Sequence, residues 1–480
     1  MRHRRREHAV AARALAAAIA VAVSAHAAHA LANGAFPDAQ SILTPVDRPG
    51  QIMLVTNFGV IMSADAGATW LWSCETDGNA FGMLYQQAPL PSTRLFAVAN
   101  QGLAFSDDGT CTWMTAGGAL AGQSVTDAYV DPAARDRVLA IGLASSIYSV
   151  YESKVGGQSF APALFTAPAN TAINSVETAR SDPMTIYMAM TSPTTAPLLA
   201  RSRDGGAHFD IKDLEPSLGR GLLRIIAIDP DDPERVLMRF NGANDQAIAL
   251  TTDGGATATR PIVANGNFTS FVRLPSGTLL VGGMVDFAVV PGLFRSRDRG
   301  ASFERLPSSP SIRALSQRDG VVYAATDNFS DGYALGTSMD EGDTWHALLS
   351  YDGVQAIIPC LKSRCQATCQ TQVDLDLWPR EVCTAEAPGM TTGMAGSSGT
   401  AGSSGAGGVG GRGGIGGAGG SRPAPPPSSG GCNISPRSEH VHVHEHEHVD
   451  EHVLVLVLVF GSLTSRRCRR RSSPSSSSRR

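Results

Sequence analysis

Four acidic residues at isolated positions are the first candidates for chemistry in this 480-residue chain. Asp127, Glu177, Asp286 and Asp327 fall near strands or loops that could reach the centre or the rim of the fold described below. Glycoside hydrolysis needs two carboxyl groups at a fixed separation, one acting as an acid and the other as a base or nucleophile. Because each of the four stands alone, we interpret them as solvated loop acids and predict no catalytic residue.

A tract of histidines near the C-terminus could bind a metal ion. Histidines occupy every second position from His440 to His448, and His452 follows shortly after. On an extended strand they would share one face, where neutral imidazoles bind Zn, Cu or Ni. No carboxylate or cysteine is arranged to support the imidazoles, as metal sites usually require. We therefore predict neither a metal nor another cofactor, and keep metal capture by this tract as an alternative.

Four of the eight cysteines lie close together. Cys360, Cys365, Cys369 and Cys383 have the spacing C-x4-C-x3-C-x13-C, which differs from a pair of C-x2-C zinc knuckles. We predict two disulfides within this group, with a zinc site as the alternative, and three pairings are possible. Cys365 and Cys369 are four positions apart and would share one face of a helix, so each should bond to a partner outside that helix.

The N-terminal residues predict export, which favours disulfides. An arginine-rich head is followed by an apolar core from 14 to 23 and then by small residues, the pattern of a secretory signal peptide over residues 1–30. Exported proteins fold in oxidising surroundings. Cys74 and Cys111 lie beside the first two copies of a repeated turn, so a bridge between these neighbouring repeats is a further candidate disulfide.

A repeated sequence motif, S-x-D-x-G-x-T-W, indicates which structural elements position these residues. It recurs seven times at intervals of 42 to 49 residues, a period typical of repeat architectures. Its Ser, Thr and Asp side chains accept hydrogen bonds from nearby amides, and its Gly takes a positive φ, so the phrase predicts a turn closed by an aromatic residue. The copies start at Ser63, Ser106, Ser153, Ser202, Thr251, Ser296 and Ser338.

We predict that the motif residues are structural. The third copy departs from the phrase, because Val155 replaces the Asp. The two tryptophans of the best copies, Trp70 and Trp345, are expected to be buried between sheets. The motif residues are Ser63, Asp65, Gly67, Trp70, Asp108, Trp113, Gly157, Phe160, Asp204, Gly206, Phe209, Asp253, Gly255, Asp298, Gly300, Phe303, Asp340, Gly342 and Trp345.

Each repeat contains four short strand patterns, clearest in the sixth. A four-stranded antiparallel unit repeated radially is a propeller blade. We therefore predict an all-β, seven-bladed β-propeller over residues 36–355, followed by a Cys-rich segment over 356–388. Both 41–46 and 354–358 could supply the inner strand of blade 1, and we favour 41–46 because an Asp-Arg-Pro turn follows it as in other repeats.

The phrase resembles the Asp-box, or BNR, repeat of sialidases, sortilin-type receptor ectodomains, xyloglucan-cleaving hydrolases and photosystem assembly factors. The resemblance implies a propeller whose box residues lie on the outer rim, away from the central channel. It does not carry over a catalytic set: the arginine trio, tyrosine nucleophile and acid of sialidases have no counterparts here, and xyloglucan-cleaving enzymes use two propellers.

The composition of residues 389–480 predicts a tether. Residues 389–431 are rich in Gly, Ser and Pro, a composition typical of a flexible linker. Residues 432–480 contain a Cys, a short apolar run over 453–463 and an Arg cluster, an order that resembles the myxobacterial C-terminal sorting tail. That run is shorter than the ~20 residues of a membrane-spanning helix. The resemblance implies attachment to the cell surface.

The charge distribution excludes one class of partner. The chain has 39 basic and 43 acidic residues, but the segment from 33 to 431 keeps 26 basic and 37 acidic ones, a net charge of -11. Nucleic-acid binding needs a basic surface, so we predict no nucleic-acid partner. The expected function is that of a monomeric, exported, surface-tethered module that binds an extracellular protein or glycan. The alternative is a secreted glycan-active hydrolase or lyase.

Overall fold

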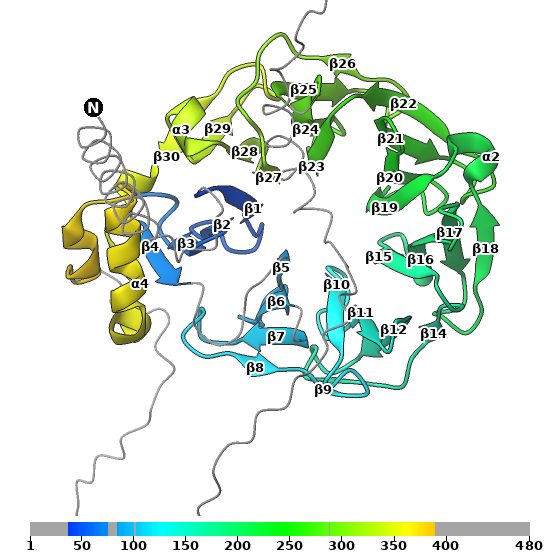
Figure 1. Cartoon of the computed structure of the whole chain (residues 1–480), viewed down its shortest axis with the longest axis horizontal. Coiled ribbons are helices and arrows are strands. Elements are labelled where there is room, and N and C mark those ends of the chain that lie inside the picture. The colour runs from blue at the N-terminus through cyan, green and yellow to red at the C-terminus, as the bar shows by residue number, and fades with distance from the viewer. Residues whose placement is uncertain (1–36, 75–83, 100–101, 288, 389–480) are drawn as a thin grey trace, which may run out of the picture. The chain divides into compact units, whose positions relative to one another are not determined.

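The computed structural model describes residues 37–74, 84–99, 102–287 and 289–388. Within them, seven sheets stand radially around a ring (Figure 1), and the four antiparallel strands of each come from one continuous stretch of chain. The prediction of an all-β, seven-bladed propeller with four-stranded antiparallel blades is confirmed. The predicted signal peptide, linker, histidine tract and sorting-like tail lie outside the described residues.

Blades 1 to 4 use the following strands. Blade 1 contains β1 (Ala39–Leu43), β2 (Ile52–Thr56), β3 (Gly59–Ser63) and β4 (Leu71–Cys74). Blade 2 contains β5 (Leu84–Gln87), β6 (Leu95–Ala99), β7 (Gly102–Ser106) and β8 (Met114–Thr115). Blade 3 contains β10 (Ser124–Val130), β11 (Val138–Ala144), β12 (Ile147–Ser153) and β14 (Phe165–Thr166). Blade 4 contains β15 (Ala172–Ala179), β16 (Asp182–Thr191), β17 (Pro197–Ser202) and β18 (Asp210–Asp213).

The remaining blades complete the ring. Blade 5 contains β19 (Gly221–Ile228), β20 (Val236–Gly242), β21 (Gln246–Thr251) and β22 (Thr259–Ala264). Blade 6 contains β23 (Asn267–Arg273), β24 (Leu279–Val285), β25 (Val290–Ser296) and β26 (Glu304–Arg305). Blade 7 contains β27 (Ala314–Arg318), β28 (Val321–Ala325), β29 (Leu335–Ser338) and β30 (His346–Leu349). A short parallel pair, β9 (Gly117–Gly118) with β13 (Ser159–Phe160), links blades 2 and 3. The short helix α2 (Glu215–Leu218) lies in the connection from blade 4 to blade 5, and α3 (Asn328–Asp331) lies between the second and third strands of blade 7.

The middle strands of the blades are apolar on both faces. Every residue of β2, β3, β6 and β7 is buried. A sheet covered on both faces selects continuous apolar runs instead of the alternating pattern of a half-exposed sheet. In a ring, each blade is covered by its two neighbours, so the core lies in the layers between the blades.

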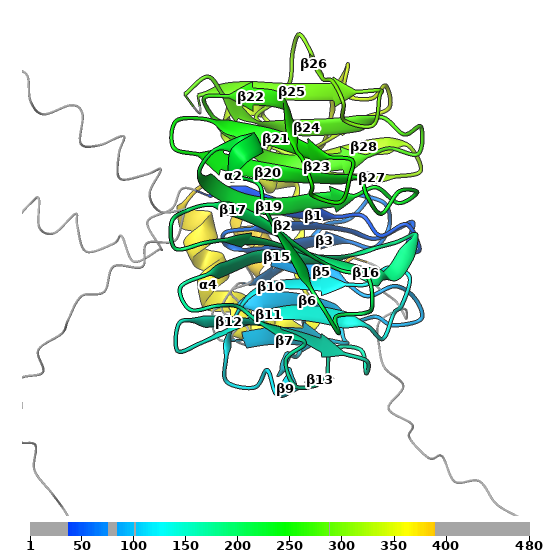
Figure 2. The same ribbon diagram turned by 90° about the vertical axis from the view of Figure 1, so that its right-hand side faces the viewer.

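The repeated turn lies on the same face of the ring as the turn between the first two strands of each blade. In blade 3, the Gly156 N–H donates to the Asp136 carbonyl (2.8 Å), and in blade 4 the Gly205 N–H donates to the Met184 carbonyl (2.9 Å). This follows from the alternating strand directions seen from the side (Figure 2). We call this side of the ring the turn face.

The chain closes the ring as predicted from its N-terminal segment. β1 pairs with β2 as the inner strand of blade 1. The later candidate, 354–358, instead contributes β31 (Ala356–Ile357), a fifth strand that runs parallel to β4 at the outer edge of blade 1. Blades 1 and 7 therefore each keep their own four antiparallel strands, and the segment after blade 7 adds a fifth strand to blade 1.

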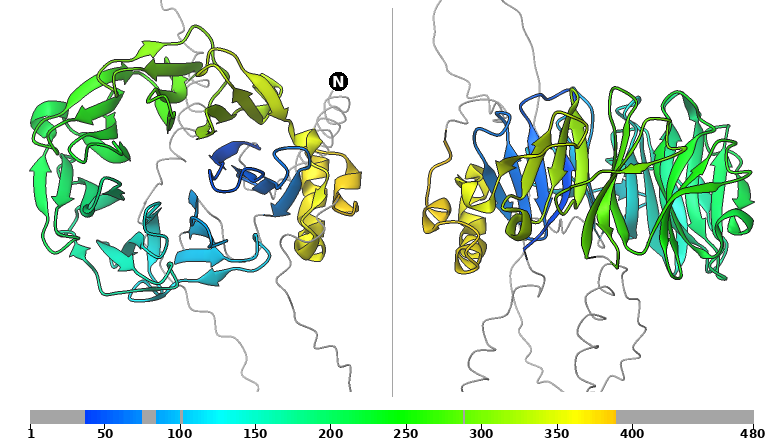
Figure 3. Two further views of the ribbon diagram at one scale, coloured as in Figure 1. Left: turned by 180° about the vertical axis from the view of Figure 1, so that it is seen from behind. Right: turned by 90° about the horizontal axis from the view of Figure 1, so that it is seen from above.

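A Cys-rich segment follows β31 on the outside of blade 1 (Figure 3). It is connected to blade 7 by η2 (Tyr351–Gly353), and it contains η3 (Pro359–Leu361), α4 (Lys362–Asp374) and η4 (Arg380–Cys383). None of the helices in the described part of the chain is long and apolar enough to cross a membrane.

The disulfides of this segment differ from the predicted pairs. Cys74 bonds to Cys365, Cys111 bonds to Cys360, and Cys369 bonds to Cys383. The predicted bridge between Cys74 and Cys111 is therefore wrong, and only one bridge lies within the group of four. The reason is that α4 packs against the outer edge of blade 1, where β4 ends at Cys74. The expectation that Cys365 and Cys369 bond outside their own helix is confirmed.

Candidate functional site

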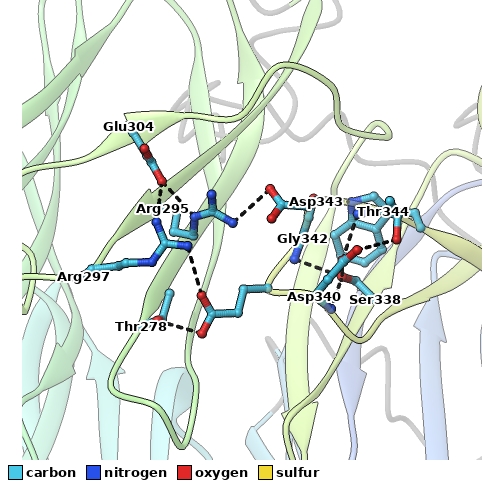
Figure 4. A network of polar contacts seen from close by, with 11 residues as sticks. Thr278, Arg295, Arg297, Glu304, Ser338, Asp340, Gly342, Asp343 and Thr344 are labelled. Carbon is cyan, nitrogen blue, oxygen red and sulfur yellow. Dashed lines mark hydrogen bonds and ion pairs between the residues drawn. The ribbon is translucent and has the colours of Figure 1, made fainter.

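Each repeated turn is held by hydrogen bonds among its own residues, as the copy in blade 7 illustrates (Figure 4). The Ser338 hydroxyl donates to Asp340 (2.8 Å) and accepts the Gly342 N–H (2.9 Å). Asp340 also accepts the backbone N–H of Thr344 (2.8 Å) and its hydroxyl (2.5 Å). The motif therefore directs its polar groups at its own backbone, which agrees with a structural role.

These bonds favour the ionised form of the motif carboxylates. The Thr344 hydroxyl and N–H lower the pKa of Asp340 to about 2, and Ser302 does the same for Asp298. The Gly of the motif is required by both conformation and space. Gly342 has a φ of 92°, and a Cβ there would lie 2.7 Å from Leu293 of blade 6.

The turn of blade 7 also contacts blade 6 (Figure 4). Arg295 of β25 donates to Glu304 in its own blade (2.9 Å) and to Asp343 in the turn (2.9 Å). Glu341 of the turn accepts the Thr278 hydroxyl of blade 6 (2.9 Å). The turns thus add polar bonds between neighbouring blades.

The aromatic residues that close the turns are not equally buried. Trp70 is 3% exposed and belongs to the core shared by blades 1, 2 and 7, whereas Trp345 is half-buried against the core of blades 6 and 7. The Trp345 indole N–H donates to the Gly342 carbonyl (3.1 Å). The expectation of complete burial holds for Trp70 and is too strong for Trp345.

The third copy, which lacks the Asp, borders a cleft of about 810 Å³ on the turn face. Turns of blades 2, 3 and 4 line it with Leu90, Arg135, Lys154 and Met184 among others. Lys154 pairs with Glu152 (3.2 Å). We call this hollow the turn-face cleft; it offers exposed apolar side chains beside charges of both signs.

Two of the four candidate acids, Asp127 and Glu177, come together on inner strands, so their interpretation as solvated loop acids is wrong. Asp127 of β10 accepts the Val176 N–H of blade 4 (3.2 Å) and one N–H of Arg224 on β19 (2.9 Å). Arg224 also donates to the Asn174 carbonyl (2.9 Å). Glu177 of β15 lies between these two strands and interacts electrostatically with both Asp127 and Arg224.

Glu177 differs from the others because its carboxyl group has no hydrogen-bond partner among the described residues. Burial, and then the negative charge of Asp127, raise its pKa to about 8, although Arg224 opposes the shift. Tyr129 of β10 lies near Glu177, and burial and the Glu177 charge raise the pKa of Tyr129. The Tyr129 hydroxyl donates to the Thr178 carbonyl (3.3 Å). We call Asp127, Tyr129, Glu177 and Arg224 the inner-strand cluster.

The other two candidate acids have local roles. Asp327 caps α3 by accepting the N–H groups of Phe329 (3.0 Å) and Ser330 (3.1 Å). Asp286 pairs with Arg305 (3.1 Å) on an exposed hairpin of blade 6. Asp327 also pairs with Arg313 (3.3 Å), which pairs with Asp38 as well (3.0 Å), and Asp331 accepts the Asp327 N–H (3.2 Å).

Sequence reasoning missed Arg224 and Tyr129, although a signal was present. Arg224 lies 97 positions after Asp127 and 47 after Glu177, close to two repeats and one repeat. Aligning the repeats would have placed all three on inner strands of successive blades. Among the described residues, no group of three or more His, Cys, Asp or Glu side chains could hold a metal ion.

Comparison with known proteins gives a likeness of fold only. No family model and no curated protein matches the chain. Among solved structures, the GH74 enzyme of Niastella koreensis is 15% identical, with 64% of this chain and 65% of that chain covered and a TM-score of 0.39. YCF48 from Cyanidioschyzon merolae is 13% identical, with 61% and 94% covered and a TM-score of 0.41.

A third solved structure, the GH74 xyloglucanase of Xanthomonas campestris, is 14% identical, with 67% of this chain and 59% of that chain covered and a TM-score of 0.36. This chain spans less than two thirds of the length of both GH74 proteins. Likenesses at this level say nothing of activity or ligand, and the propeller assignment comes from the chain's own strands.

Proposed function

We propose that this chain is an exported propeller that binds an extracellular glycan or protein through its inner-strand cluster. The observation that supports it most is Glu177, a half-buried carboxyl group with no hydrogen-bond partner among the described residues. Its carboxyl oxygens are therefore open to a hydrogen bond that no neighbouring side chain supplies. A ligand at the centre of blades 3 to 5 would supply it.

The chemistry of the cluster favours a sugar over a charged group. A carboxyl with a pKa of about 8 is mostly protonated at neutral pH, so its O–H donates while its carbonyl oxygen accepts. Asp127 and Arg224 neutralise each other through their 2.9 Å ion pair. Sugar hydroxyls both donate and accept, which suits a cluster with no net charge.

The proposal is tested by screening the folded, exported protein on a glycan array and in pull-downs from the native cell surface, with wild type beside Glu177→Ala and Glu177→Gln. Glu177→Ala should weaken binding about tenfold or more, since the hydrogen bond between Glu177 and the ligand is lost. Asp286→Asn, which alters an exposed acid of blade 6, is the matched control and should bind like wild type.

The pH dependence makes the test specific to Glu177. Binding by wild type should weaken as pH rises through about 8, because the ionised carboxylate can no longer donate. Glu177→Gln keeps a donor and an acceptor at every pH, so its binding should not fall in that range. Full binding by Glu177→Ala would contradict the use of this cluster.

Export and surface attachment belong to the same proposal. The predicted signal peptide, the linker and the sorting-like tail support them, as do three disulfides, which form in oxidising compartments. Protease shaving of intact cells should release the propeller, and protein confined to the cytoplasm would contradict the proposal.

A glycan-active hydrolase is the second candidate, and the pair of Glu177 with Asp127 favours it. Such enzymes use two carboxyl groups as acid and base, and burial raises the pKa of both Asp127 and Glu177 here, that of Glu177 to about 8. The bonds of Asp127 to Val176 and Arg224 favour a structural role instead. Release of reducing ends by wild type and not by Glu177→Gln would support hydrolysis, and no release by wild type would remove this candidate.

A further inference from the structure

The joint between blades 1 and 7 is the one place where neighbouring blades are not consecutive in the chain. Side chains hold it: the Thr44 and Ser316 hydroxyls share a hydrogen bond (2.6 Å), and Arg318 donates to the Gln51 carbonyl (2.7 Å). In each of the other six joints, the polypeptide itself runs from one blade to the next. The ring could therefore open here without breaking a covalent bond, unless something else spans the joint.

Residues 354–388, which we call the clasp, span it from outside. The clasp leaves blade 7 through η2 and lies along the outer strand of blade 1, where the Gln355 N–H donates to the Trp70 carbonyl (2.9 Å) and the Ile358 N–H to the Trp72 carbonyl (2.9 Å). Trp378 then packs on Trp72 with ring centroids 5.2 Å apart. One apolar core includes residues of blades 1, 2 and 7 and of the clasp.

Two disulfides fix the clasp to the far side of the joint. Cys365 of α4 bonds to Cys74 at the end of β4, and Cys360 bonds to Cys111 in the turn of blade 2. They join residues 291 and 249 positions apart, so each closes a covalent circuit that passes through blades 3 to 7. The third bond, Cys369–Cys383, spans 14 positions and lies within the clasp.

We propose that the clasp closes the propeller ring covalently, and does so only once Cys74–Cys365 and Cys111–Cys360 have been oxidised. Each bond forms by exchange with a disulfide-bearing oxidant. One thiolate of the pair attacks the oxidant's disulfide to give a mixed disulfide, and the second thiolate then displaces the oxidant's sulfur. The oxidant leaves as a dithiol that carries the two electrons, and the two thiol protons pass to it or to solvent. A reduced chain has the same blades and an unlatched joint.

Hydrogen exchange of the full-length, oxidised protein tests the proposal. In a variant with Cys74, Cys111, Cys360 and Cys365 all replaced by Ala, amides of β1 and β27 at the joint should exchange about tenfold faster or more, because local opening becomes cheaper. Amides of β16 in blade 4, opposite the joint, should be unchanged. Cys369→Ala with Cys383→Ala is the matched control, and its joint should exchange like wild type.

A second experiment opens the circuit after folding and leaves every cysteine intact. A protease site is inserted between Asp352 and Gly353, which are exposed in the connection from blade 7 to the clasp, and the folded protein is then cut. The cut should speed exchange at β1 and β27 as much as losing both Cys74–Cys365 and Cys111–Cys360 does. A cut placed after residue 388 is the control. Wild-type exchange at the joint after the 352 cut would overturn the proposal, even if the cysteine variant fails to fold.

Discussion

The seven repeated turns use hydrogen bonds between residues two to four positions apart, whereas the clasp joins residues 291 and 249 positions apart. The turns are copied around the ring, and the clasp occurs once. Losing one turn should therefore weaken one blade and its contact with the neighbouring blade, while losing the clasp affects how the whole ring is closed. The comparison separates interactions that act at one blade and its neighbour from interactions that close the ring.

Removing both Cys74–Cys365 and Cys111–Cys360 should have the largest effect on the free energy of unfolding. In the chain-entropy model, a disulfide that closes a loop of more than 100 residues stabilises a protein by about 5 kcal/mol, and one that closes ~15 residues by about 3 kcal/mol. The variant with Cys74, Cys111, Cys360 and Cys365 replaced by Ala should therefore lose more free energy of unfolding in denaturant titrations than Cys369→Ala with Cys383→Ala. Equal losses would mean that loop length does not decide the contribution of the clasp.

Trp70→Ala should cost about 3 to 5 kcal/mol, since it removes a large side chain from a packed core. Trp345→Ala should cost less, because Trp345 is only half-buried. Thermal unfolding of the two variants under one buffer gives the ranking. A larger loss at Trp345 would show that the turns of blades 1 and 7 differ in a way that burial does not describe.

Asp340→Ala should cost about 1 kcal/mol through lost hydrogen bonds within the turn of blade 7. The pH dependence has a definite sign. Because the pKa of Asp340 is about 2 in the folded protein and near 3.8 when unfolded, its stabilisation is present above pH 3.8 and is lost as pH falls toward 2. Asp340→Asn should flatten that part of the stability profile, and the disulfides of the clasp contribute nothing to it.

Val155→Asp should have the smallest effect, a gain of at most about 1 kcal/mol. It restores the motif carboxylate in the third copy, where Ser153 already accepts the Gly157 N–H (3.0 Å). Denaturant midpoints with an unchanged slope would measure it. A loss of stability would indicate that the β9–β13 pair, which includes Phe160 of this copy, requires the altered turn.

The sequence predicted the repeated part of this molecule well because its information is local. Each turn is written within eight residues, so the copy number, the blade count and the inner position of β1 could all be inferred from spacing. The clasp could not be inferred in the same way. Nothing in the spacing of Cys360 and Cys365 indicates that their partners lie 249 and 291 positions away, since that depends on where α4 packs.

The inner-strand cluster could be predicted from the sequence only in part. Asp127 and Glu177 were recognised as isolated acids, but their approach to Arg224 depends on the angular order of blades 3 to 5, which only the assembled ring fixes. The raised pKa of Glu177 is likewise a property of its surroundings and not of its position in the chain. Local motifs therefore predicted the propeller fold, whereas the pKa and the partners of the cluster residues depend on contacts between blades.

The path of the chain out of the propeller also has a mechanical consequence. The chain continues past residue 388 from the clasp, and not from the outer strand of blade 7. A pull on that end is carried by Cys383–Cys369 into α4 and by Cys365–Cys74 into blade 1. Tension thus loads covalent bonds in series before it can peel β30 from its sheet. A tethered propeller built in this way would hold its shape under shear that unzips a strand-terminated one.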